Sequence, residues 1–353
     1  MSATHRVLIM GASYGSLLAV KLLAAGHAVR LVCLPAEAKA FNEDGARVRM
    51  PVRGRDDLYE IDSRDLPGAL SASGPAEADP ADYDLVVLAM QEPQYRSSGV
   101  RELLASVAAA RRPCMSIMNM PPLPYLARLP GVDLAACRPC YTDASVWDAV
   151  DPALMTLCSP DPQAFRPPDQ PVNVLQVRLP TNFKAARFVG DDHTAMLRDL
   201  AAGVEAARFG PERLELPVKL KVHDSVFVPL AKWSMLLAGN YRCVQQDGMR
   251  SIRDAVHSDL AASRAVYESV GALCRALGAD AADLVPFEKY AEAARSLASP
   301  SSAARALASG APNIERVDRL VQTLMRQRGM SSPDIDRTVA LVDGWLEANR
   351  RKA

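Results

Sequence analysis

The chain has 353 residues, and its 41 Lys and Arg balance its 41 Asp and Glu, so the formal net charge is zero. General nucleic-acid binding requires a basic surplus, which this chain lacks, although a small basic pocket for a phosphorylated ligand stays compatible. The length corresponds to two domains, or to one large domain with an appendage. No run approaches the ~20 apolar residues that span a bilayer, and the N-terminus lacks a signal-peptide pattern, so we expect a cytoplasmic protein without membrane contact.

The seven cysteines are spread along the chain in an odd number, a pattern typical of free thiols rather than of a disulfide framework. Cys137 and Cys140 form an isolated CxxC pair. A zinc site would need a second pair or nearby histidines at matching spacing, so we expect no metal.

Strand and helix signals alternate in the N-terminal part of the chain. In chain order the predicted elements are a strand at 6–10, a glycine turn from Gly11, a helix at 17–25, a strand at 28–34, a strand at 84–90, a helix at 97–110 and a strand at 114–118. Such alternation predicts a parallel sheet.

The rest of the chain consists of a proline-rich middle segment and a mostly helical C-terminal part. Residues 138–180 are rich in proline, with a predicted strand at 172–179, and a helix is expected at 193–208. The predicted helices after residue 225 span 227–243, 252–277, 287–298, 314–328 and 334–350. We therefore predict an α/β Rossmann-type N-terminal domain, 1–220, that binds a dinucleotide, and an all-α C-terminal domain, 221–353, for substrate binding or dimerisation.

The glycine turn is the main nucleotide signal. A glycine turn between a first strand and a first helix brings backbone N–H groups and a helix N-terminus to a pyrophosphate. Only Gly11 fits the GxGxxG fingerprint cleanly, and a Rossmann-like fold with a tight turn and no cofactor stays open as the alternative. The residues predicted to bind the cofactor here are Gly11, Ala12, Ser13, Tyr14, Gly15 and Ser16.

The end of the second strand usually distinguishes the two nicotinamide cofactors. An acid there holds the ribose 2′-OH of NAD, and an arginine suits the 2′-phosphate of NADP. The strand ends in Val32-Cys33-Leu34-Pro35, with neither, while Glu37 and Lys39 lie nearby. These residues leave NADP and NAD both open.

Five segments together resemble the ketopantoate reductase (2-dehydropantoate 2-reductase) family, within the 6-phosphogluconate-dehydrogenase-like group. They are the N-terminal unit with Gly26-His27, the strand Asp84–Gln91, the segment Ser116–Met120, the helix Lys232–Asn240, and Ser301-Ser302 followed by Asn313-Ile314-Glu315. The resemblance implies a Rossmann domain and a helical domain with the active site in the cleft between them. It also implies NADPH-dependent reduction of a 2-oxo acid to a 2-hydroxy acid.

The resemblance also implies roles for single residues. Lys232 would be the general acid, and Asn119 would position this lysine and the nicotinamide. Gln91 would contact the cofactor where the family has a lysine, and Leu236 replaces a polar residue, which indicates a more apolar substrate. The implied substrate contacts are Asn240, Ser301, Ser302, and either Asn313 or Glu315.

Six of these residues also have a structural interpretation. Lys232 lies in an apolar helix and could extend its ammonium to solvent. Ser301 and Ser302 read as helix caps after Pro300, and Asn313 reads as the N-cap of a helix that starts at Ile314. Asn119 and Asn240 read as a turn residue and a polar helix end.

Two further functions stay open from the sequence. One is an opine-type or imine-reducing dehydrogenase with the same cofactor, and the other is a nicotinamide-binding regulatory protein with a degenerate site. The partners that we expect are a small-molecule substrate and a second copy of the chain in a homodimer, because long Ala-rich helices near the C-terminus offer a face for pairing.

Overall fold

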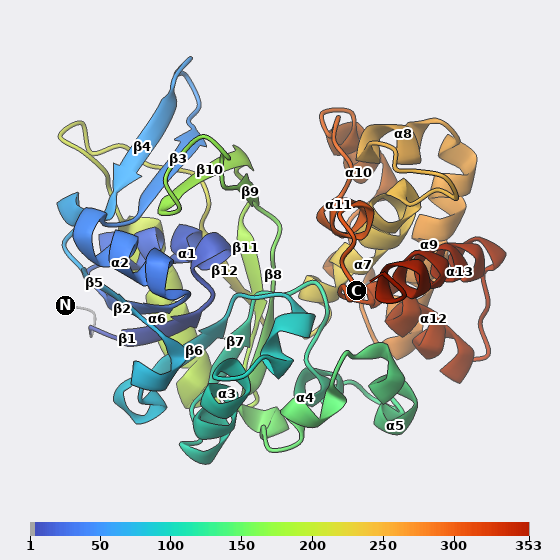
Figure 1. Cartoon of the computed structure of the whole chain (residues 1–353), viewed down its shortest axis with the longest axis horizontal. Coiled ribbons are helices and arrows are strands. Elements are labelled where there is room, and N and C mark those ends of the chain that lie inside the picture. The colour runs from blue at the N-terminus through green and yellow to red at the C-terminus, as the bar shows by residue number, and fades with distance from the viewer. Residues whose placement is uncertain (1–3, 353) are drawn as a thin grey trace. The chain divides into compact units, whose positions relative to one another are not determined.

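The computed structural model describes residues 4–352, which divide into two compact units (Figure 1). Unit 1 consists of residues 4–90, 94–125 and 146–224, and unit 2 of residues 91–93, 126–145 and 225–352. Unit 1 is an α/β structure with a Rossmann-type sheet, and unit 2 is built from helices, so the predicted fold class is confirmed. The functional division into 1–220 and 221–353 stays a prediction.

The main sheet of unit 1 has eight strands in the order β12-β11-β8-β7-β6-β1-β2-β5. They are β1 (Arg6–Met10), β2 (Ala28–Val32), β5 (Ala69–Ser73), β6 (Leu85–Leu88), β7 (Cys114–Ser116), β8 (Met155–Ser159), β11 (Phe183–Ala186) and β12 (Leu220–His223). The six strands from β8 to β5 all pair in parallel. Counted in chain order within this sheet they run 6-5-4-1-2-3, which is the Rossmann order.

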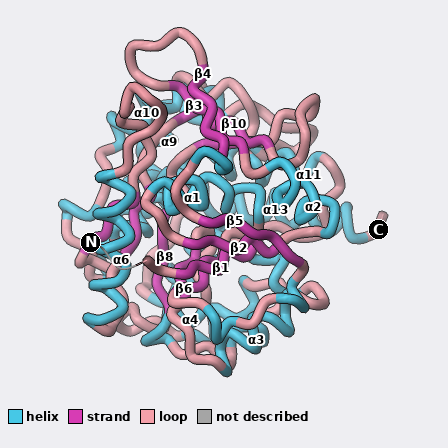
Figure 2. Tube along the Cα trace, turned by 90° about the vertical axis from the view of Figure 1, so that its left-hand side faces the viewer, coloured by secondary structure: helices cyan, strands magenta, loops and turns pink. Residues whose placement is uncertain are grey.

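A second sheet in unit 1 was not predicted from the sequence. Its order is β4-β3-β10-β9, with β3 (Arg47–Pro51), β4 (Leu58–Asp62), β9 (Gln163–Phe165) and β10 (Val174–Leu179). Figure 2 shows α1 (Ala12–Ala24) between β1, β2 and β5 on one side and β3 and β10 on the other. Because it packs against both sheets, α1 is buried all round from Gly15 to Leu23.

The other helices of unit 1 cover the main sheet. They are α2 (Pro35–Asp44), α3 (Val100–Ala109) and α6 (Asp191–Ala206). Figure 2 shows α1 and α3 on opposite sides of the strands, as expected for a parallel sheet whose strands are joined by helices. The single turn α4 (Leu123–Leu126) lies where the chain passes from unit 1 to unit 2.

Unit 2 consists of helices. They are α5 (Leu134–Cys137), α7 (Lys232–Met235), α8 (Ile252–His257), α9 (Leu260–Leu277), α10 (Phe287–Ala294), α11 (Ser302–Ala308), α12 (Val317–Gln327) and α13 (Pro333–Arg350). The helix predicted at 252–277 is divided into α8 and α9, because Asp259 caps a new helix by accepting a hydrogen bond from the N–H of Ala262.

The helix predicted at 227–243 is not continuous. It consists of a 3₁₀ turn at Val228–Ala231, α7, a π-helical turn at Leu236–Asn240 and a 3₁₀ turn at Tyr241–Cys243. The hydroxyl of Tyr290 donates to the carbonyl of Met235 at 3.0 Å, and in an α-helix that carbonyl would accept from the N–H of Gly239. A Cβ on Gly239 would lie 2.0 Å from the Tyr290 hydroxyl. The glycine thus makes room for a side chain that inserts into the helical ladder and widens it.

Candidate functional site

The turn after β1 requires its first glycine. Gly11 has φ +108°, and its N–H donates to the carbonyl of Val32 at 2.9 Å. A Cβ at this position would lie 2.6 Å from Cγ of Met90 and 2.8 Å from the carbonyl oxygen of Ala89. Gly15 is equally constrained, since its Cβ would lie 2.6 Å from Cγ2 of Ile9. The helix therefore packs closely on β1 and β6, as a dinucleotide fold requires.

The N-terminus of α1 is suited to an anion. Within residues 4–352, no side chain caps α1, and its first turn contains no acidic residue. Ser13 is exposed in this turn, and Gly11 before it has no side chain. Backbone N–H groups at the start of a 13-residue helix carry partial positive charge, so the cradle fits a pyrophosphate.

Two other residues of the turn bond within the protein. The hydroxyl of Tyr14 donates to the carbonyl of Pro162 at 2.7 Å, and the ring meets Phe183 edge to face. Burial raises the pKa of Tyr14 well above its usual value, with the charges of Cys158 and Asp161 adding to the effect. Ser16 donates to the carbonyl of Ser13 at 2.9 Å. Tyr14 is thus an anchor for the segment before β9 rather than an open ligand contact.

The carboxyl end of β2 carries an ion pair that no local sequence pattern shows. The Nη1 of Arg166, just after β9, donates to Oε1 of Glu37. The other carboxylate oxygen of Glu37 accepts from the N–H of Leu34 at 3.0 Å, at the start of α2. The pair lies beside Cys33, whose pKa rises to about 12, first through burial and then through Glu37, while Arg166 acts in the opposite direction.

Asn119 and Gln91 follow the carboxyl ends of two neighbouring strands, as predicted. Asn119 comes three residues after β7 and is half-buried, and Gln91 comes three residues after β6 and is exposed. Strand ends of this kind border the ligand crevice in parallel sheets. Gln91 is counted with unit 2 and Asn119 with unit 1.

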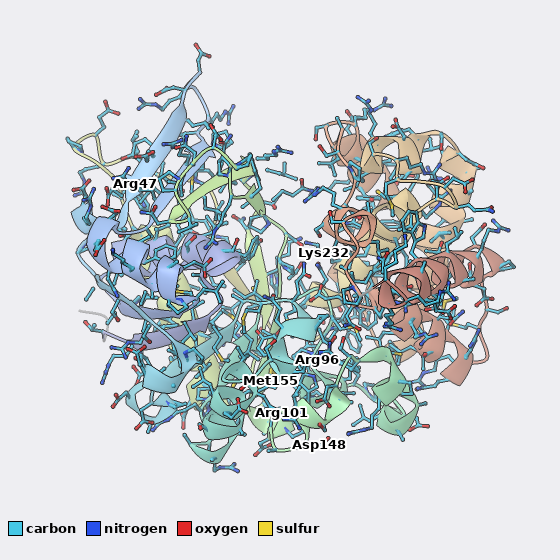
Figure 3. All side chains as sticks on the ribbon, in the orientation of Figure 1. Arg47, Arg96, Arg101, Asp148, Met155 and Lys232 are labelled. Carbon is cyan, nitrogen blue, oxygen red and sulfur yellow. The ribbon has the colours of Figure 1, made fainter. Side chains whose placement is uncertain are left out.

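Lys232 is the first residue of α7 and is half-buried (Figure 3). Lys232 and Asn240 both fall in the helix predicted at 227–243, but they do not lie on one regular α-helix, because Asn240 belongs to the π-helical turn that follows α7. Asn240 ends that turn and is half-buried. Leu236, at the position that resembles a polar family residue, is 3% exposed.

The structure brings Ser301 to Asn240. The Ser301 hydroxyl donates to the backbone carbonyl of Asn240 at 2.7 Å and accepts from the N–H of Ala304 at 3.2 Å. Ser301 is 1% exposed and is the N-cap of α11, as the structural interpretation predicts. Ser302, the next residue, is exposed.

The prediction that Asn313 caps a helix starting at Ile314 is wrong. The helix begins at Val317, because the Tyr241 hydroxyl accepts from the N–H of Val317 and donates to the carbonyl of Glu315, which holds the preceding residues in a non-helical path. The Oδ1 of Asn313 instead accepts from Arg350 at 3.2 Å. Glu315 is buried, and its Oε1 accepts from the N–H of Glu92 at 3.4 Å.

The CxxC pair is buried. The Sγ of Cys137 accepts from Nε2 of Gln327 at 3.6 Å, and that of Cys140 lies 3.5 Å from Oγ1 of Thr323. Both thiols are free, and burial raises the pKa of each. In the part of the chain that the structure describes, no group of three or more His, Cys, Asp or Glu could hold a metal ion, and no helix is long and apolar enough to cross a membrane.

Three residues that shape this region were missed by sequence reasoning. Arg166 lies in the proline-rich segment and meets Glu37, which is 129 residues away along the chain, so no local pattern could reveal it. Gly239 and Tyr290 produce the π-helical turn. A glycine inside an apolar helical run is a signal of close approach, and this one could have been recognised.

The sequence matches no family model and no curated protein. Solved structures match over nearly the whole chain. A 2-dehydropantoate 2-reductase from Methylococcus capsulatus has a TM-score of 0.68 at 14% identity, covering 98% of this chain and 97% of its own. The structure of D-mandelate dehydrogenase with NADH and anilino(oxo)acetate has a TM-score of 0.63 at 12% identity, covering 98% and 99%.

A dimeric ketopantoate reductase from Staphylococcus aureus is similar over 98% of this chain and 99% of its own, with a TM-score of 0.59 at 9% identity. The likenesses extend through both units, since each of these structures covers 98% of this chain. The chain therefore has the ketopantoate reductase fold over nearly its whole length.

Proposed function

We propose that the chain is an oxidoreductase that uses a nicotinamide cofactor, with NADPH as the preferred form, to reduce a 2-oxo acid or related carbonyl to a 2-hydroxy acid. The observation that carries the proposal is the turn at Gly11, where a side chain would collide with Ala89 and Met90 and the following helix begins without a side-chain cap among residues 4–352. These features suit close approach of a pyrophosphate.

The fold likeness supports the reaction class. 2-Dehydropantoate is a 2-oxo acid and mandelate is a 2-hydroxy acid, and enzymes named for both have this fold. One of the structures holds NADH, so NAD stays a possible cofactor here. Fold alone does not assign activity, which depends on the residues of the candidate site.

In this proposal the backbone from Gly11 to Ser16 holds the pyrophosphate, with Ala12, Ser13, Tyr14 and Gly15 forming the first turn of the helix. Gln91 and Asn119, after neighbouring strands, border the nicotinamide half of the cofactor. The cofactor, when bound, supplies the hydride for the carbonyl carbon.

Lys232 acts as the general acid in the proposed reaction. Negative charge builds on the carbonyl oxygen during reduction, and an ammonium that is held in a half-buried position can neutralise it and donate the proton. The lysine begins a short helix whose other side chains are mostly apolar, which favours partial desolvation of the amine.

Substrate contacts are proposed for Asn240, Ser301, Ser302 and either Asn313 or Glu315. Ser302 is the better placed serine for a carboxylate, because the donor of Ser301 is already used on Asn240. Leu236 contributes an apolar residue where the resembled family has a polar one, so we propose a substrate more apolar than ketopantoate. We also propose a homodimer, for which the dimeric S. aureus relative gives support.

The test uses the purified full-length protein. Binding of NADPH and NADH is measured first, and loss of the reduced cofactor is then followed with a panel of 2-oxo acids, simple ketones, and 2-oxo acids supplied together with amines. We expect tight cofactor binding and turnover of an apolar 2-oxo acid without an amine. Turnover only with an amine would assign an imine-reducing enzyme. Tight binding without turnover of any compound would favour a regulatory protein, and lack of cofactor binding would refute the proposal entirely.

A further inference from the structure

The carboxyl end of β2 is the part of a Rossmann sheet that meets the adenosine ribose of a dinucleotide. Here β2 ends at Val32 and is followed by Cys33 and Leu34, so the end of the strand provides neither an acid nor a base, and Arg30 within the strand bonds to Ser71 and to the carbonyl of Glu77. Leu34, the residue that precedes α2, is 68% exposed. The charged groups at this place come instead from Glu37 and Arg166.

We infer that Arg166 recognises the 2′-phosphate of NADP(H), and that the second sheet of unit 1 supplies the cofactor specificity which β2 lacks. The inference rests on the proposed cofactor binding. Arg166 comes from the segment between β9 and β10, 132 residues beyond Leu34 in the sequence.

The first argument is the position of the guanidinium. Glu37 is in the first turn of α2, and its carboxylate joins the N–H of Leu34 to Nη1 of Arg166. The arginine is therefore fixed beside the residue that directly follows the end of β2. The Cys33 thiol at the same strand end is close enough for the charge of Arg166 to oppose the rise in its pKa.

The second argument is the path of the segment that carries Arg166. At its beginning, the Tyr14 hydroxyl in the first turn of α1 holds the carbonyl of Pro162. Lys184 on β11 pairs with Asp161 at 3.0 Å and fixes the same region. The segment 161–166 thus runs from the helix start that suits the pyrophosphate to the strand end that suits the ribose. A dinucleotide bound to a Rossmann sheet contacts both places, with its pyrophosphate at the helix start and its adenosine ribose at the strand end.

The third argument is the unused bonding capacity of Arg166. A guanidinium has five N–H donors, and only Nη1 is bonded to Glu37. Within residues 4–352 the buried Nη2 has no hydrogen-bond partner, while the side chain as a whole is 25% exposed. A planar guanidinium with donors to spare suits a phosphate, which accepts two parallel hydrogen bonds.

The competing interpretation is that Arg166 only ties β9 to α2 through Glu37. The two interpretations differ in what the two partners of the ion pair do. If the ion pair only holds β9 against α2, removing either side chain changes the affinity for NADPH and for NADH by the same factor. If Arg166 binds the 2′-phosphate, removing Arg166 weakens NADPH alone, whereas removing the charge of Glu37 relieves repulsion and does not weaken NADPH.

The experiment measures dissociation constants of NADPH and NADH for the full-length wild type, Arg166→Met, Arg166→Lys and Glu37→Gln, with folding checked by thermal unfolding. Arg178→Met is the matched control, because Arg178 lies on β10 of the same sheet. Its guanidinium stacks on the ring of Phe165, and within residues 4–352 it forms no ion pair. We expect Arg166→Met to weaken NADPH about 10- to 100-fold and NADH little. Arg166→Lys should recover part of the loss, and Glu37→Gln should keep or improve NADPH binding.

Three results would overturn the inference while leaving the proposed function in place. They are equal weakening of both cofactors by Arg166→Met, equal loss in Glu37→Gln, and a wild type that prefers NADH. A wild type that binds neither cofactor would refute the proposed function itself. If Arg166→Met does not fold, the comparison of Arg166→Lys with Glu37→Gln still decides, because Arg166→Lys keeps the positive charge but loses the planar set of donors, whereas Glu37→Gln removes the negative charge beside the arginine.

Discussion

The hydroxyl of Ser301 donates a 2.7 Å hydrogen bond to the backbone carbonyl of Asn240 and accepts one from the N–H of Ala304, so it joins the end of the π-helical turn to the start of α11. The two residues are 61 positions apart, and both belong to the candidate substrate contacts. The bond fixes the backbone of Asn240 and uses the donor of Ser301. We therefore expect Ser301 to influence the candidate site through the backbone of Asn240.

This contact separates the roles of two adjacent serines. Ser301→Ala removes a helix cap and a buried hydrogen bond, so we expect the free energy of unfolding to fall by about 1–2 kcal/mol, measured by urea denaturation. Ser302→Ala changes an exposed residue and should leave stability unchanged while raising KM for the substrate. A loss of stability in Ser302→Ala with unchanged KM would contradict this assignment.

The fold could be predicted where its signals are local. The strand, turn, helix and strand from Arg6 to Val32 have sequence patterns that depend only on neighbouring residues, and the structure has them there. The second sheet could not be predicted, because β3 pairs with β10, whose residues are more than 120 positions away, and no local pattern shows which strands pair. Burial of α1 on all sides follows from that sheet and was missed with it.

The candidate site shows the same limit. The glycine turn and the polar residues after β6 and β7 follow from sequence order, since parallel strands end at one edge. The start of α12 does not, because a distant hydroxyl of Tyr241 takes the N–H of Val317. Likewise, Arg166 bonds to Glu37 because it follows β9, a strand of the second sheet. The π-helical turn depends on Tyr290, which belongs to α10.

Replacement of Lys232 tests the proposed acid. Lys232→Met should lower kcat by about 10²- to 10⁴-fold, because proton donation to the carbonyl oxygen is lost, while the dissociation constant of NADPH stays unchanged. Steady-state kinetics and cofactor titration measure the two quantities. Lys289→Met is the control, since Lys289 is an exposed lysine of α10, and it should retain wild-type turnover. Full activity of Lys232→Met would remove the lysine from the mechanism.

The π-helical turn makes a prediction about coupling. Gly239→Ala would place a Cβ 2.0 Å from the Tyr290 hydroxyl, so we expect a loss of about 1–3 kcal/mol in unfolding free energy. Tyr290→Phe removes the hydroxyl and leaves the carbonyl of Met235 without that donor, at a cost of about 1 kcal/mol. The double variant should lose less than the sum of the two, because the clash needs both groups. Additive losses in urea denaturation would mean that the hydroxyl does not cause the widened turn.

The turn at Gly11 is tested by comparison with a second glycine of positive φ. Gly11 has φ +108° and Gly26 has φ +85°, but a Cβ meets neighbouring atoms only at Gly11. Gly26→Ala should cost about 1 kcal/mol from backbone strain alone, and Gly11→Ala distinctly more, together with weaker NADPH binding. Urea denaturation and cofactor titration provide the measurements. Equal costs at the two positions would show that the contacts with Ala89 and Met90 yield easily.

Lys21 gives a prediction about pH. It is 1% exposed, its ammonium donates to the carbonyl of Pro217 at 2.5 Å and lies 5.0 Å from the centre of the Phe209 ring, and burial, followed by the charge of Lys219, lowers its pKa from 10.5 to about 7. Between pH 7 and pH 10.5 the unfolded chain therefore binds more protons at this site than the folded chain. The contribution of Lys21 to the free energy of unfolding therefore increases as the pH rises from 7 to 10.5. Below pH 7 the folded protein carries the full cost of the buried charge.

Lys21→Met keeps much of the side-chain volume and removes the charge. We expect it to stabilise the protein by about 1–4 kcal/mol at pH 7, less the lost hydrogen bond to Pro217, with the gain shrinking toward pH 10. Urea denaturation of variant and wild type at several pH values measures the difference, in which the other titrating groups cancel. Lys39→Met is the control, because Lys39 is exposed on α2, and it should show no such pH dependence. A constant difference for Lys21→Met across the window would mean that the ammonium stays charged in the fold at every pH tested, held by the carbonyl of Pro217 and the face of Phe209.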